Sequence, residues 1–116
     1  MRPVTQSRTG GNGRCFPACL ASILELPERA VPDLDNTKEW EVNDFLRPYG
    51  FTYMEFPAED VGPVGYHIIT GKSPRGGLHA VVGLNGRMVH DPHPRDGTGR
   101  GLARVDNYGI LLPRSK

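Results

Sequence analysis

The chain has 116 residues, and its 14 Lys and Arg residues nearly balance its 13 Asp and Glu residues. This length predicts a single domain, residues 1–116, with one core. The balanced charge argues against nucleic acid or a membrane surface as the default partner. No apolar stretch approaches the roughly 20 residues needed to cross a bilayer, and the first residues lack the apolar core of a signal peptide. We therefore expect a cytoplasmic protein.

The N-terminal third of the chain combines an extended arm, a glycine-rich turn and an apolar segment over residues 15–26. Almost every face of that segment is apolar, which predicts a buried, central helix that Pro27 ends. Cys15 stands at its start, where free backbone N–H groups and the positive end of the helix dipole favour a thiolate. Cys15 is therefore the candidate nucleophile. Cys19 lies one turn later, inside the apolar pattern, and is expected to be a core residue.

A second helix is expected to end near Arg47, capped at its start by Asn36 or Thr37 and with Trp40 facing the core. Alternating or apolar segments bounded by turn residues then indicate strands at 51–56, 65–71, 79–84, 87–90 and 108–112. Two helices followed by antiparallel strands predict an α+β fold, in which both helices pack on a small antiparallel sheet.

The dipeptide Asn85-Gly86 predicts a tight hairpin between the third and fourth of these strands. A regular two-residue turn places Asp91 opposite Ala80, and therefore next to His79. A thiol on a helix, a histidine on a strand and a carboxylate after the next strand follow the order of a Cys-His-Asp catalytic triad. In this interpretation His79 is the general base for Cys15, and Asp91 orients the imidazole.

Two stretches of the chain resemble the small papain-like, C39-like cysteine peptidases of bacteria and phages. They are Asn12–Ser22 around the cysteine, and Leu78–Val82 followed by His90-Asp91-Pro92. The resemblance implies a papain-like fold with the first helix carrying the nucleophile. It also implies a thiol protease, or a related amidase or acyltransferase, that acts on a peptide or protein through a thioester acyl-enzyme and needs no cofactor.

In that superfamily a glutamine before the nucleophile often lines the oxyanion hole, which implies Gln6 in this role with the backbone N–H of Cys15 as the second donor. Asn12 is the amide closer to the cysteine, so the choice between Gln6 and Asn12 stays open. Glycines before the cysteine leave room for a substrate to approach, and we expect Asn12 and Gly13 to contact it.

A second hypothesis retains the papain-like fold without the activity, as a binding or regulatory module such as an inhibitor encoded by a phage or mobile element. A zinc version of this module would use Cys15, Cys19, His90 and His93, whose spacings are individually compatible with Zn²⁺. Two cysteines four residues apart on one helix, with prolines around the histidines, are uncommon in structural zinc sites. The enzyme is therefore the preferred interpretation.

Overall fold

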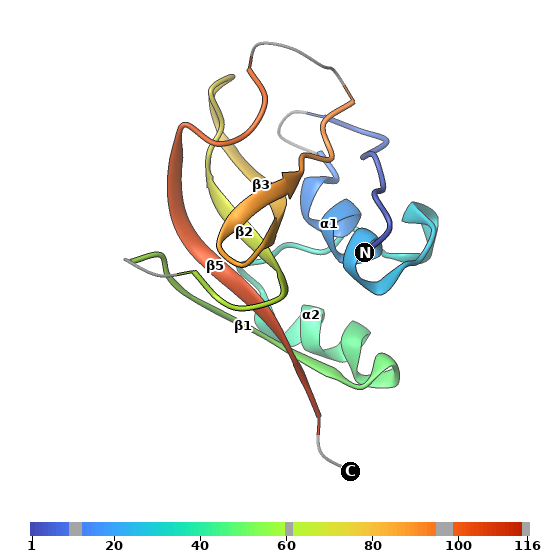
Figure 1. Cartoon of the computed structure of the whole chain (residues 1–116). Helices are drawn as coiled ribbons and strands as arrows, with labels where there is room; N and C mark the ends of the chain where they lie inside the picture. The colour runs from blue at the N-terminus through green and yellow to red at the C-terminus, as the bar shows by residue number, and fades with distance from the viewer. Residues whose placement is uncertain (10–12, 60–61, 95–98, 115–116) are drawn as a thin grey trace.

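The computed structural model describes residues 1–9, 13–59, 62–94 and 99–114. Within these ranges the helices α1 (Cys15–Leu24) and α2 (Glu39–Leu46) precede a sheet of five antiparallel strands (Figure 1). Short 3₁₀ turns follow the helices at Glu28–Ala30 and Arg47–Tyr49. The strands are β1 (Phe51–Pro57), β2 (Tyr66–Lys72), β3 (Leu78–Leu84), β4 (Arg87–His90) and β5 (Arg104–Pro113). The predicted α+β class, with both helices beside an antiparallel sheet, is confirmed.

The strands lie in the order β1-β5-β2-β3-β4, so the last strand of the chain fills the place between β1 and β2. Strand β5 pairs along its length with β1, from Phe51 opposite Pro113 to Pro57 opposite Asn107. Both helices cover one face of this sheet: α1 packs on β3 and β2, and α2 packs on β1 (Figure 1). The first residue of α1 therefore lies close to the start of β3.

The main core lies between the helices and this face. It contains the fully buried side chains of Leu20, Val42, Ile68 and Val82, which come from α1, α2, β2 and β3. As the sequence predicts, α1 is apolar on nearly every side and is buried over most of its length. Burying such a helix against a sheet is the main favourable contribution to folding in a chain of this size.

Three boundaries show the main differences from the sequence prediction. Helix α1 ends at Leu24, because Glu25 adopts a left-handed conformation (φ 59°) two residues before Pro27. Helix α2 begins only at Glu39. It follows a turn in which Asp35 accepts hydrogen bonds from the backbone N–H and the hydroxyl of Thr37. Strand β5 begins at Arg104, four residues before the predicted start.

The prediction that Trp40 faces the core is wrong, because its side chain is 67% exposed. Helix α2 is short, and it buries only Val42 and Leu46 fully. Because this helix begins at Glu39, Trp40 lies in its first turn, on the side that faces away from the core.

The N-terminal arm is fixed along α1 and reaches the end of β4. The backbone N–H of Val4 donates to Ser22 Oγ at 2.9 Å, and the carbonyl of Val4 lies 2.7 Å from His90 Nε2. Two residues later, the N–H of Gln6 donates to the carbonyl of Pro92 at 2.8 Å. The arm therefore links α1, which begins with Cys15, to the segment that carries Asp91.

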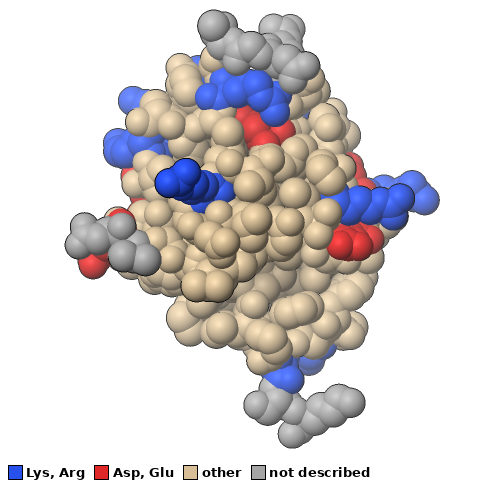
Figure 2. Space-filling view, in the orientation of Figure 1, with Lys and Arg blue, Asp and Glu red and all other residues tan. Residues whose placement is uncertain are grey.

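The charge on the surface follows the balanced composition. On the face seen in Figure 2, basic and acidic side chains stand in small separate groups around a largely uncharged centre. None of the helices in the described ranges has the length and apolarity needed to cross a membrane.

Candidate active site

Cys15 is the first residue of α1, and its free thiol is half-buried. Burial raises the pKa of this thiol, but a hydrogen bond to His79 and the attraction of its charge outweigh that effect. The backbone N–H groups of Ala80 and Phe16 also favour the thiolate, so the pKa of Cys15 lies below its ordinary value. The position at a helix N-terminus and the neighbouring imidazole thus act in the same direction.

His79 lies between the thiol and a carboxylate. Its Nε2 is 2.7 Å from Asp91 Oδ1, which leaves Nδ1 for Cys15, and the exposed fractions of the two side chains are 4% and 0%. Burial alone would lower the pKa of His79, but the hydrogen bonds to Asp91 and Cys15 raise it to about 9. At neutral pH this geometry favours an imidazolium between a thiolate and a carboxylate.

Asp91 is itself held by backbone donors. Oδ1 accepts the N–H of His93 at 2.9 Å, and Oδ2 accepts the N–H of Gly101 at 2.6 Å. Burial would raise the pKa of Asp91, but His79 and these two N–H groups hold it well below its usual range. The carboxylate therefore stays charged and cannot rotate away from the imidazole without losing backbone hydrogen bonds.

The structure brings Cys15, His79 and Asp91 together, but the register expected for Asp91 is wrong. The hairpin begins as predicted, with Leu84 opposite Arg87, and a bulge in β4 then shifts His90 opposite Val82. In a regular ladder Asp91 would share the face of Ala80. Strand β4 ends at His90, so Asp91 follows the ladder, and the segment after β4 brings its carboxylate to His79.

Gln6 lies beside this group, on the N-terminal arm, and is 5% exposed. It lines a cavity of about 500 Å³ together with Cys15 and His79. Its Nε2 donates to the carbonyl of Arg8 at 2.7 Å, and its Oε1 is buried without a hydrogen-bond partner among the described residues. Because an amide nitrogen carries two hydrogens, one donor remains available beside the thiol.

The other two predicted contact residues have different outcomes. Gly13 lines a second cavity of about 520 Å³, which also reaches Cys15. Asn12 lies outside the described residues. Of the two candidate oxyanion donors, Gln6 and Asn12, the structure therefore describes only the position of Gln6.

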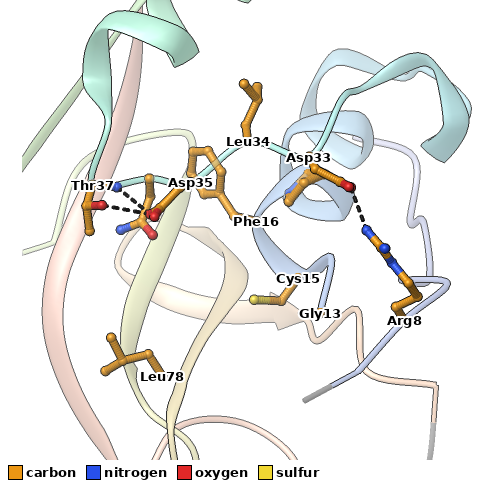
Figure 3. Close-up of a pocket in the computed structure, with 11 residues that line it drawn as sticks. Arg8, Gly13, Cys15, Phe16, Asp33, Leu34, Asp35, Thr37 and Leu78 are labelled. Carbon is orange, nitrogen blue, oxygen red and sulfur yellow. Dashed lines mark hydrogen bonds and ion pairs between the residues drawn. The ribbon is translucent and has the colours of Figure 1, made fainter. Parts of the chain in front are cut away.

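The two cavities meet at Cys15 and Leu78 and together form an open cleft beside the thiol. Figure 3 shows the thiol of Cys15 between the segment 33–37 and the side chain of Leu78. Leu78 directly precedes His79, is 77% exposed and lines both cavities. A polypeptide lying in this cleft would pass over the sulfur and against an exposed apolar side chain.

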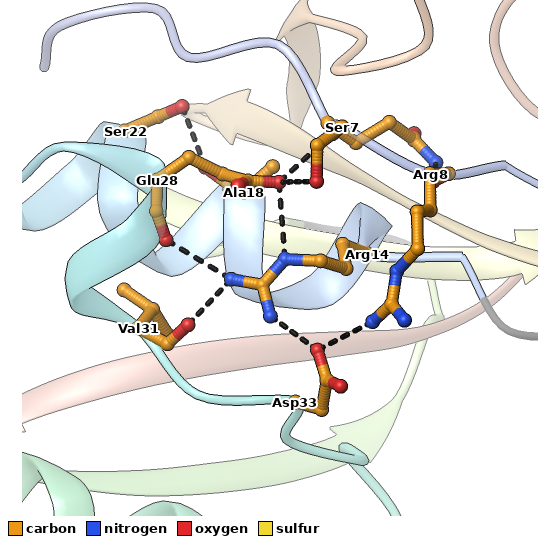
Figure 4. A network of polar contacts seen from close by, with 9 residues as sticks. Ser7, Arg8, Arg14, Ala18, Ser22, Glu28, Val31 and Asp33 are labelled. Atoms are coloured by element: carbon orange, nitrogen blue, oxygen red, sulfur yellow. Dashed lines mark hydrogen bonds and ion pairs between the residues drawn. The ribbon is translucent and has the colours of Figure 1, made fainter.

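Arg14, the residue before Cys15, is a buried anchor that the sequence analysis missed. Its guanidinium contacts the carboxylates of Glu28 and Asp33 and the carbonyls of Glu28 and Val31 (Figure 4). Ser7 donates to the same carboxylate of Glu28 from its backbone N–H and its hydroxyl, at 2.8 and 2.9 Å. These contacts join the arm, the loop after α1 and the start of α1 immediately beside Cys15.

The only hint of this anchor in the sequence is an arginine next to the cysteine, with acidic residues 14 and 19 positions later. Nothing in that spacing indicates burial, because a lone arginine in a glycine-rich turn is ordinarily solvated. A planar guanidinium that donates to several fixed oxygens holds the backbone more firmly than a single cap does.

The four residues of the zinc hypothesis do not form one cluster in the structure. Cys19 is fully buried, and burial raises the pKa of its thiol well above its ordinary value. His90 contacts the carbonyl of Val4. In the part of the chain that the structure describes, no group of three or more His, Cys, Asp or Glu side chains is arranged to hold a metal ion.

We expect Cys15 to react with iodoacetamide at a lower pH than an ordinary thiol. Its pKa is lowered, so the thiolate fraction rises earlier as the pH increases. We follow the rate of alkylation by intact mass. The pH at which this rate is half-maximal should be lower for Cys15 than for a free cysteine peptide. Cys19 should remain unlabelled in the folded protein. Equal labelling of the two cysteines, or an ordinary pH profile for Cys15, would contradict this expectation.

The chain matches no protein-family model, no curated protein and no solved structure. Any functional conclusion therefore depends on the geometry of this site and on the sequence pattern that points to it.

Proposed function

We propose that this protein is a papain-like cysteine peptidase, or a related amide hydrolase, that uses Cys15, His79 and Asp91 as a catalytic triad. The observation that carries the proposal is the placement of His79 between the two other groups: its ring is 2.7 Å from Asp91, and its interaction with Cys15 lowers the pKa of that thiol. It lies at the N-terminus of a buried helix and at the floor of an open cleft. Each element has a role in nucleophilic catalysis by cysteine.

In the first half of the reaction the Cys15 thiolate attacks the carbonyl carbon of an amide. A C–S bond forms, and the carbonyl π electrons move to the oxygen. When this intermediate collapses, the C–N bond breaks and the imidazolium of His79 gives its proton to the leaving amine. The products of this half are a free amine, a thioester on Cys15 and a neutral imidazole.

In the second half, neutral His79 takes a proton from water as the water oxygen attacks the thioester. The C–S bond then breaks, a carboxylic acid leaves, and the thiolate and imidazolium return. Asp91 fixes the orientation of the ring and stabilises its charged form throughout. An amine that replaced this water would convert the same site into an acyltransferase.

The negative oxygen of each intermediate needs donors close to the thiol. The free N–H of the Gln6 amide and the backbone N–H of Cys15, which has no acceptor within the helix, are suited to this role. The hydrogen bond from Gln6 to the carbonyl of Arg8 restricts the rotation of the amide, which lines the same cavity as Cys15 and His79. We assign the side-chain donor to Gln6 on this ground.

Peptides or proteins are the substrate class that the cleft supports. Two open cavities of about 520 and 500 Å³ meet at Cys15, which suits a chain that enters on one side and leaves on the other. The helix that carries Cys15 also packs on the antiparallel sheet that carries His79, which agrees with a papain-like arrangement. A bacterial or phage origin follows from the sequence resemblance alone.

A complex peptide mixture in water enriched in ¹⁸O tests this proposal. Hydrolysis breaks an amide and adds one oxygen from water, so new C-terminal carboxylates should carry one ¹⁸O when analysed by mass spectrometry. An acyltransferase would instead give new amide-linked products without the label. Folded protein that produces neither kind of product would favour the alternative, a papain-like binding or regulatory module without activity.

A further inference from the structure

A third, smaller pocket opens beside the catalytic group. It has a volume of about 170 Å³ and reaches both Cys15 and His79. Its remaining wall comes from the turn before α2 and from strands β1, β2 and β5. The polar members of that wall are Asn36, Thr37, Glu55, Thr70, Asp106 and Asn107.

A bulge in β5 builds the far side of this pocket. Thr70 pairs with Asn107 and Gly71 pairs with Val105, so Asp106 is an extra residue in its strand. Successive residues of a regular strand point to opposite faces. The bulge instead allows both Asp106 and Asn107 to line the same pocket.

Gly71 makes this bulge possible, because a Cβ at this position would lie 1.8 Å from the carbonyl oxygen of Arg104. No other residue type could occupy it without moving the backbone of β5. The polar wall beside His79 is thus fixed by close backbone packing between β2 and β5.

Thr70 supplies an independent indication that a ligand occupies the pocket. Its side chain is 8% exposed, and its hydroxyl is buried without a hydrogen-bond partner among the described residues. A buried hydroxyl without a partner costs stability. A polar group of a ligand in the pocket would satisfy it.

The charge of the pocket is negative. Glu55 accepts hydrogen bonds from Tyr53 Oη at 2.7 Å and from Asn36 Nδ2 at 2.8 Å, both at Oε2, which leaves Oε1 open. No Lys or Arg forms an ion pair with Glu55 within the described ranges. The carboxylate of Asp106 is paired with Arg104 at 2.6 Å, so its charge is compensated. The uncompensated charge is therefore that of Glu55.

We propose that this pocket selects substrates with a cationic side chain in the acyl half, bound by Glu55 and Thr70. The inference rests on the proposed function, because the acyl half is the part that stays bonded to the sulfur of Cys15. The volume of about 170 Å³ corresponds to about five or six waters of liquid. That space suits a short chain with an ammonium or guanidinium end and excludes a large aromatic side chain.

Peptidyl chloromethyl ketones provide the probe, because a thiolate displaces chloride and forms a stable thioether. Two pairs of dipeptide reagents are needed, with lysine or norleucine either next to the ketone or one residue before it, and glycine at the other place. Lysine and norleucine have similar length and differ in the terminal charge. The rate of Cys15 labelling, followed by intact mass, gives a lysine-to-norleucine ratio for each position.

We expect a ratio of about ten at one of the two positions, as for a single contact to a charged group. E55Q should bring this ratio close to one, and T70V should lower it about threefold without lowering the melting temperature. E41Q is the matched control, since it removes a carboxylate from α2 that does not line the pocket, and it should keep the full ratio. High salt should lower the wild-type ratio.

Unfolded protein would react with both reagents alike and at both cysteines, so the ratio is taken from protein labelled at Cys15 alone, in variants that circular dichroism shows to be folded. Equal labelling by the lysine and norleucine reagents at both positions would overturn the pocket proposal and leave the hydrolase proposal standing. A ratio that E55Q leaves unchanged would also overturn it. Failure of all four reagents to label folded protein faster than they label a free cysteine peptide would overturn both proposals.

Discussion

Replacement of Cys15 by alanine is expected to abolish the ¹⁸O-labelled cleavage products completely. In the proposed mechanism this thiol forms the C–S bond of the intermediate, and the second cysteine of the chain is fully buried in the core. The substitution removes a half-buried sulfur at the start of α1, so the fold should survive. Far-UV circular dichroism and thermal melting would verify this, and mass spectrometry of the peptide mixture would measure the loss.

Cys19→Ala is the matched control for this result. It removes the same atom from the same helix one turn later, where Cys19 has no contact with solvent. Its cost should be confined to stability, at about 1–2 kcal/mol for a small cavity in the core, with cleavage retained. Cleavage that persists in Cys15→Ala, or disappears in Cys19→Ala while that protein is folded, would remove Cys15 from the role of nucleophile.

The sequence predicted the local elements well, because each has a strong local signal. The apolar residues after Cys15 are stable only when they are buried. The Asn85-Gly86 turn has the positive φ angles that a tight hairpin requires, 54° and 87°. These two features determine the neighbours of the site, namely the helix that carries the thiol and the strands that precede and follow the turn.

The register of Asp91 could not be predicted, because a bulge depends on packing at a distance. Its extra residue, Val89, is half exposed and has nothing unusual in its local sequence. The contact with His79 was nevertheless expected, since His79 and Asp91 lie near the same end of the hairpin in either register. The sequence thus predicted which residues form the site, but it did not predict the strand register around them.

Contacts between distant segments account for the remaining features. Arg14 becomes an anchor only when the loop with Glu28 and Asp33 folds back onto α1. The pocket beside Cys15 exists only because β5, the last strand, inserts between β1 and β2 and bulges at Asp106. Neither arrangement has a local signature, because both depend on residues more than ten positions apart.

Replacement of His79 by alanine is expected to lower the rate of cleavage by on the order of 10²–10⁴, the usual contribution of general acid–base catalysis. The imidazolium lowers the pKa of Cys15 and later protonates the leaving amine, so both the nucleophile and the leaving group suffer. The alkylation profile of Cys15 should move to higher pH in this variant, because burial still raises the thiol pKa while the opposing charge is gone.

His90→Ala is the control that separates this chemical role from general damage near the hairpin. His90 lies one residue before Asp91, and its described hydrogen bond is to the carbonyl of Val4. Its loss should loosen the N-terminal arm and lower the melting temperature, but leave the pH profile of Cys15 in place. A shift of that profile in His90→Ala, with none in His79→Ala, would show that His90, and not His79, is the imidazole beside the thiol. The pH profile decides because it reports the charge next to the sulfur, whereas loss of activity alone would follow from either kind of damage.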